Sequence, residues 1–114
     1  MAEGNEPRPL NAEYKTQFSA VDGRVQIQRG KCEIIENAVI VEVTFRVLKQ
    51  ITATTTPLFG NFPYSQDVNH IMSLYNAQLQ LITDAVPRVY GGQMISGKQM
   101  AVDDVYTVKG VYVI

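Results

Sequence analysis

The most constraining feature of this sequence is a long alternation of apolar and polar residues, AVIVEVTFRVL, from Ala38 to Leu48. One set of alternate positions is entirely apolar: Val39, Val41, Val43, Phe45 and Val47. The other set is mixed and includes Glu42 and Arg46. Because successive side chains of a strand point to opposite faces, this pattern predicts a strand with one buried face. A helix would scatter the valines around its circumference, and β-branched residues are poor helix formers.

Further strands are indicated on both sides of this one. Arg24–Arg29 alternates in the same way, and Gly30-Lys31 predicts a turn into a second strand at Cys32–Glu36, so the two segments form a predicted hairpin. Lys49–Thr56 is rich in β-branched residues and reads as a strand, or as a strand that runs into a loop. Pro57 ends it and opens a predicted loop over residues 57–66.

The second half of the chain is less regular. Residues 68–75 fit a strand, which we favour, or one to two turns of helix after Asp67 as N-cap. Residues 77–83 alternate and predict a strand with Leu79 and Leu81 facing inward. Short strands between glycines follow, and residues 105–114 form a final strand in which Gly110 indicates a bulge or a close backbone approach. Strands about every 8–12 residues predict an all-β antiparallel sandwich or barrel.

The length of 114 residues fits one domain. Residues 1–20 contain two prolines, a glycine and several charges without a sustained period, and they predict an extended N-terminal arm before a β-sandwich domain over residues 21–114. Two interpretations of the arm remain open. It is a flexible leader, or it is a tether that docks on a neighbouring subunit or a larger particle.

Several kinds of chemistry find no support in the sequence. The net charge is −1 and the basic residues are scattered, so no nucleic-acid partner is expected. Cys32 is the only cysteine and His70 the only histidine, so neither a metal site nor a catalytic triad is predicted. Asp103-Asp104 is interpreted as a turn between strands. Apolar runs are shorter than the roughly 20 residues of a membrane span. We expect no cofactor, no membrane insertion and no enzymatic activity, and synthesis in a cytoplasm.

Three stretches carry a family resemblance: GRVQIQRGKCEII, AVIVEVTFRVLKQITATTTPLFGNFP and AVDDVYTVKGVYVI. Their order resembles the receptor-binding head and tip domains of bacteriophage tail fibres and baseplates. The resemblance implies a jelly-roll-like sandwich, a homotrimer, an arm that joins other virion or tail subunits, and host surface carbohydrate as ligand. It places the protein in the virion, after synthesis in the host bacterial cytoplasm. Residues 1–20 show no coiled-coil or repeat pattern of a fibre shaft, and in this the sequence departs from the fibre members of the family.

Two functions follow from these observations. In the first, a receptor-binding module holds a host glycan through aromatic stacking and amide hydrogen bonds. The candidate ligand-binding residues combine rings with planar polar groups in the loop-rich middle of the chain: Asn61, Phe62, Tyr64, His70, Tyr75, Arg88 and Tyr90. In the second, a virion structural or decoration protein uses its loops and arm for assembly and has no receptor. Phe59, Phe62 and Tyr64 fit either an exposed surface or a plug at one end of the sandwich. Low charge, small size and the two apolar-containing faces of residues 38–48 also favour a homotrimer.

Overall fold

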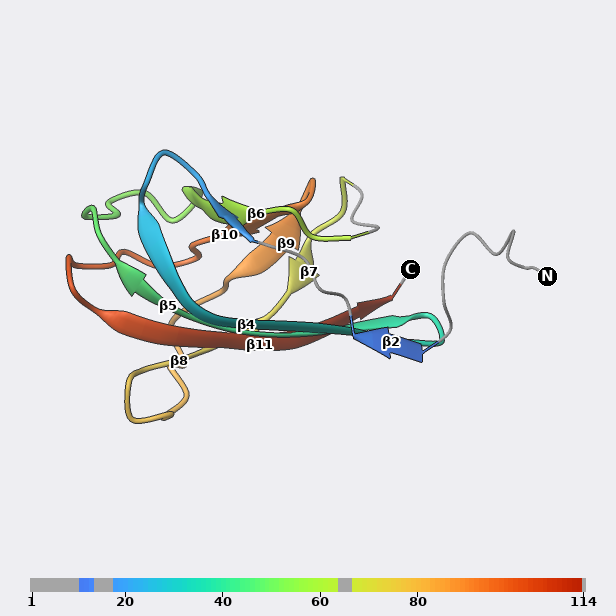
Figure 1. Cartoon of the computed structure of the whole chain (residues 1–114). Helices are drawn as coiled ribbons and strands as arrows, with labels where there is room; N and C mark the ends of the chain where they lie inside the picture. The colour runs from blue at the N-terminus through green and yellow to red at the C-terminus, as the bar shows by residue number, and fades with distance from the viewer. Residues whose placement is uncertain (1–10, 14–17, 64–66, 114) are drawn as a thin grey trace.

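The computed structural model describes residues 11–13, 18–63 and 67–113, and in these residues every regular element is a strand. Two five-stranded antiparallel sheets pack face to face (Figure 1). The first sheet has the order β2 (Asn11–Glu13), β4 (Val25–Ile35), β5 (Ala38–Val47), β11 (Val105–Val113) and β8 (Ser73–Tyr75). The second has the order β3 (Ser19–Ala20), β6 (Pro57–Gly60), β10 (Gln93–Ile95), β9 (Arg88–Tyr90) and β7 (His70–Ile71). The predicted all-β antiparallel sandwich is confirmed.

The core forms between the two sheets, and β5 lies at its centre. The five predicted inward residues of β5, from Val39 to Val47, are all buried, while Glu42 and Arg46 are exposed. Across the core, Phe59 of β6 meets Phe45 with ring centroids 5.6 Å apart. Fully burying a side chain of this size is worth about 1.5–3 kcal/mol, so the alternation of β5 supplies a large share of the stability.

The predicted hairpin at Gly30-Lys31 is wrong. Strand β4 runs without a reversal from Val25 to Ile35, with a bulge between Ile27 and Arg29, and the chain turns only at Glu36-Asn37. Gly30 serves another purpose, because a Cβ at this position would lie 2.9 Å from the Phe18 ring. The glycine therefore allows the aromatic ring of an N-terminal residue to lie against the strand, and no turn is needed to explain it.

Two other segments also differ from the prediction. Residues 57–60, which were predicted to belong to a loop, form strand β6. Residues 49–56, which were predicted to form a strand or a strand that runs into a loop, make only one isolated bridge, between Ile51 and Met100. The predicted strand over residues 77–83 is a loop, since the Asn76 Oδ1 accepts hydrogen bonds from the backbone N–H of residues 78 and 80, both at 2.9 Å. Leu79 adopts φ +61° and is 61% exposed. Asn side chains commonly bind nearby backbone in this way, and local bonding here overrides the alternation.

Residues 68–75 are extended, as favoured, but they divide between the sheets. Strand β7 pairs with β9 in the second sheet and β8 pairs with β11 in the first. Met72 lies at the crossing, against Gly110 of β11, so the close approach predicted for this glycine is confirmed. The β11–β5 register continues through Gly110 without a bulge.

The described part of the predicted arm contributes an edge strand to each sheet. Strand β2 pairs with residues 33–35 of β4, and β3 pairs with residues 59–60 of β6. Phe18 packs against the core between these two strands. Three-residue and two-residue strands are too short to show a period, which explains why the sequence pattern did not reveal them.

Candidate functional site

A shallow depression of about 370 Å³ lies on the outer face of the second sheet. We call it the outer hollow and define it by its lining residues: Thr55, Asn69, Arg88, Tyr90 and Ile95. Val89 is fully buried between Arg88 and Tyr90, so these two side chains point outward from β9. Tyr90 is 42% exposed and Arg88 is half-buried. Two predicted ligand-binding residues therefore meet in one site.

The β9–β10 hairpin fixes the wall of the outer hollow. Gly91 and Gly92 form its turn with φ angles of +57° and +82°. Two successive positive φ angles match the twist of the flanking strands in a tight hairpin, and glycine adopts them without steric cost. The turn sets a register in which Ile95 lies opposite Arg88. The two side chains consequently share one face of the sheet.

Thr55 reaches the outer hollow from a loop that is bonded to the segment after β10. The Thr56 hydroxyl donates to the Ala53 carbonyl at 2.7 Å, and the Ser96 hydroxyl donates to the same oxygen at 3.1 Å. The Ser96 N–H donates to the Thr56 carbonyl at 2.9 Å. These bonds hold the loop in place although it forms almost no regular strand.

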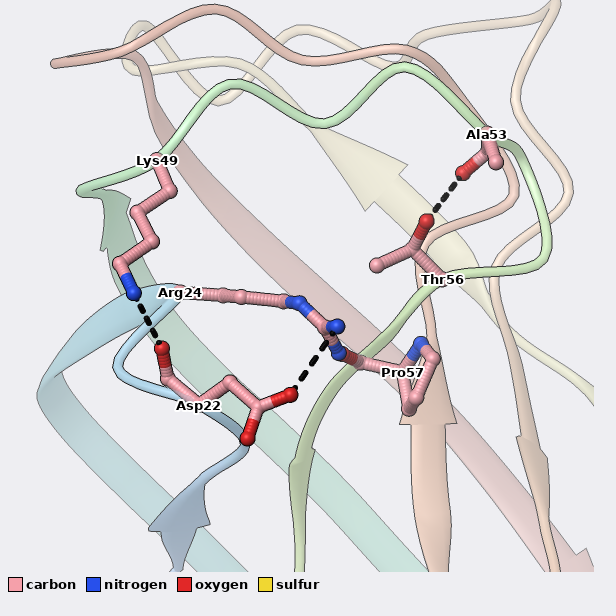
Figure 2. Close-up of polar contacts among 6 residues, drawn as sticks. All are labelled: Asp22, Arg24, Lys49, Ala53, Thr56 and Pro57. Carbon is pink, nitrogen blue, oxygen red and sulfur yellow. Dashed lines mark hydrogen bonds and ion pairs between the residues drawn. The ribbon is translucent and has the colours of Figure 1, made fainter.

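The same loop is tied to the turn before β4 (Figure 2). The Arg24 guanidinium donates to the Pro57 carbonyl at 2.9 Å and lies 3.1 Å from the Asp22 carboxylate. The Lys49 ammonium donates to the Asp22 carbonyl at 2.8 Å. Each end of the loop therefore has a charge-assisted contact, and such contacts are stronger than neutral hydrogen bonds.

The other predicted site residues do not reach the outer hollow. Phe62 is 7% exposed and its ring packs 4.8 Å from Phe18, so it belongs to the core and not to a binding surface. Phe59 is buried as well, which matches the interpretation of these two rings as a plug. Asn61 is exposed at φ +83°, and its backbone N–H donates to the Gly92 carbonyl at 3.0 Å.

Two further predicted residues lie elsewhere in the molecule. His70 points toward the sandwich interior and stacks on Tyr112, with centroids 4.7 Å apart. Tyr75 is on the first sheet, where the Lys109 ammonium lies 5.4 Å from its ring centre. Tyr64 lies outside the described residues.

A second concave surface, which the sequence did not predict, lies beside the turn before β11. Two depressions of about 430 and 440 Å³ share Lys98, Asp104 and Tyr106, and we call the pair the end groove. The Asp104 carboxylate accepts a hydrogen bond from the Tyr106 hydroxyl at 3.0 Å. Burial, the hydrogen bond that Tyr106 donates to Asp104, and the charges of Asp104 and Asp84 together raise the pKa of Tyr106 to about 12.

The only sequence signal near the end groove was the acidic pair Asp103-Asp104. Its interpretation as a turn agrees with the structure, where Asp103 has φ +75° and lies 3.6 Å from the Arg46 guanidinium. The groove itself depends on residues 50–52, 76–82 and 98–106, three segments that are far apart in sequence. No local pattern shows that they meet.

The described residues offer little for covalent or metal chemistry. Cys32 is buried, and this burial raises the pKa of its thiol to about 11. A thiol of this kind is a poor nucleophile at neutral pH. Within the described ranges, no three His, Cys, Asp or Glu side chains come together as metal ligands.

Comparison with known proteins gives no match to a family model, a curated protein or a solved structure. Among residues 11–13, 18–63 and 67–113, no helix is long and apolar enough to cross a membrane. Function is therefore inferred from the geometry of the outer hollow.

Proposed function

We propose that the protein is a binding module of a phage virion, a receptor-binding tip or a tail or baseplate component that holds a host surface glycan in the outer hollow. The part of the N-terminal arm before β2 would join it to other virion subunits. Shallow, open sites of this kind suit sugars, which expose many hydroxyls and a few apolar ring faces. The module would act by binding alone, without catalysis.

One observation carries this proposal. The outer hollow joins the Tyr90 ring to the polar ends of Arg88, Asn69 and Thr55 over a floor that includes the buried Ile95. An aromatic ring offers a stacking surface, and the guanidinium, amide and hydroxyl groups offer hydrogen bonds of fixed direction. Arg88 and Tyr90 are on a hairpin and Thr55 is in a braced loop, so little ordering entropy is lost at these three residues on binding.

A glycan array probed with the intact protein tests the proposal. Tyr90→Ala should abolish binding or weaken it at least tenfold, because the stacking surface is lost. Tyr75→Ala is the matched control, since this tyrosine lies on the other sheet and should leave binding unchanged. A blank array together with no binding to host cells would contradict the receptor role.

The assembly function is a second candidate, and a patch on the first sheet favours it. Val113, Ala38 and Ile35 lie side by side across three strands, and Val111 lies beside Ile40 in the adjacent row, which ends in Glu33. Val111 and Val113 are 53% and 68% exposed. A contiguous apolar surface of this kind is typical of a subunit interface.

A homotrimer is therefore part of the proposal. Sedimentation should give a species of three chains, and Val113→Asp should shift it to a single chain. A wild-type protein that sediments as a 12.7 kDa monomer at micromolar concentration would contradict this state. If the protein serves only in assembly and has no receptor, the trimer would form and the glycan array would stay blank.

A further inference from the structure

Arg88 is a cation whose cross-strand neighbours are both isoleucines. The register places it between Ile71 of β7 and Ile95 of β10. Opposite charges commonly occupy such cross-strand positions, because they stabilise the pair. Here Arg88 forms no ion pair with any residue that the structure describes. Asp67 lies against Gly91 at the nearby turn, but it does not pair with Arg88.

The groups around Arg88 supply hydrogen-bond donors and no negative charge. The outer hollow contains the Tyr90 and Thr55 hydroxyls and the Asn69 amide, and no carboxylate lines it. The end groove is different, because Lys98 there is accompanied by Asp103 and Asp104. The outer hollow is thus a half-buried site with one uncompensated positive charge.

We propose that the outer hollow selects saccharides that carry a carboxylate, with Arg88 as the residue that determines this selectivity. The inference rests on the proposed function, since it names the class of glycan held at the same site. A guanidinium binds a carboxylate through two parallel N–H···O bonds, which fix orientation as well as add affinity. Ile95, which is 8% exposed and lines the hollow beside Arg88, reduces water access on that side and strengthens this contact.

The test uses an array of glycans that contain uronic acids, N-acetylneuraminic acid or 2-keto-3-deoxyoctonic acid, each printed beside its carboxyl methyl ester. Wild-type protein should bind acid forms on the order of tenfold to a hundredfold more tightly than the esters, as expected for loss of a charged hydrogen-bonded pair. Arg88→Gln should remove this preference. Arg88→Lys, which keeps the charge without the planar fork, should retain only part of it. Lys98→Gln is the control and should bind as wild type does.

Titration with sodium acetate, followed by NMR, tests the site without any sugar. Saturable shifts confined to the amides of residues 88–95 and absent in Arg88→Gln support the inference, even if the glycan array is blank and the proposed function fails. Equal binding of acids and esters, with no acetate response, overturns the inference but leaves the proposed function standing. A blank array with no acetate response contradicts both. The comparison of acids with esters uses wild-type protein, so it does not depend on the folding of a variant.

Discussion

The side chain of Met72 lies directly on the backbone of Gly110, in the space that a Cβ would need. Met72 is the residue between β7 and β8, where the chain passes from the second sheet to the first. Gly110 is in the middle of β11, which pairs with both β5 and β8. This contact therefore closes one side of the sandwich, and it depends on a glycine.

We expect Gly110→Ala to lower the free energy of unfolding by about 1–3 kcal/mol, because the added methyl group displaces Met72 from a packed position. Urea denaturation measures the change. Gly60→Ala is the control, since its Cβ would lie 3.4 Å from its nearest neighbours and fits with little movement. The control should change stability by less than about 1 kcal/mol. Equal effects of the two substitutions would show that the Met72 contact is not the cause.

Asn76 organises the loop after β8, and its replacement should weaken that loop. Asn76→Ala removes two acceptor bonds, to the N–H of Gln78 and of Gln80, and should cost about 1 kcal/mol in an exposed position. Asn76→Asp keeps both acceptor bonds and should cost less. Hydrogen exchange of the two amides provides a direct measurement. Unchanged protection in Asn76→Ala would mean that the side chain does not hold the loop.

Tyr106 should make the free energy of unfolding depend on pH in the alkaline range. Its pKa is raised from the ordinary value of 10.0 to about 12 in the folded state, so the unfolded chain loses the proton first. The contribution of the protonated Tyr106 to the free energy of unfolding is fully present below pH 10 and is lost as the pH rises toward 12. In Tyr106→Phe, the free energy of unfolding should fall less steeply across this interval. Identical slopes for wild type and variant in urea denaturation from pH 9.5 to 12 would contradict the expectation.

Cys32 should resist thiol reagents while the protein is folded. The side chain is buried and its thiol pKa is raised from 9.0 to about 11, so little thiolate exists at neutral pH. A chromogenic disulfide reagent should react within seconds in denaturant and far more slowly in native buffer. Rapid native reaction would show that the core opens readily around β4. The same raised pKa adds to the loss of stability above pH 9.

The core was the most predictable part of the molecule. The alternation from Val39 to Val47 identified a strand, its buried face and its place in a two-layer fold, because strand periodicity depends only on which residues avoid water. The loop over residues 77–83 shows the limit of this approach. Its alternation was as clear as that of β5, but the Asn76 side chain bonds the backbone locally and leaves Leu79 in solvent.

The candidate site was predictable only in part. Arg88 and Tyr90 were chosen for their chemistry, and both line the outer hollow. Asn69, Thr55 and Ile95 were missed, because they come from three separate places in the chain: the segment before β7, the loop before β6 and strand β10. Phe62 was chosen for the same chemistry as Tyr90, yet it packs beside Phe18 in the core.

The sequence by itself determined that the chain forms strands, which face of β5 is buried, and that the backbone is closely approached at Gly110. These properties follow from local sterics and from the hydrophobic effect acting residue by residue. Only the tertiary structure decided that Gly30 receives the Phe18 ring instead of forming a turn, and that Arg88 lies between two isoleucines without a carboxylate. Both depend on contacts between segments distant in sequence, which are fixed by strand register and packing and leave no local pattern.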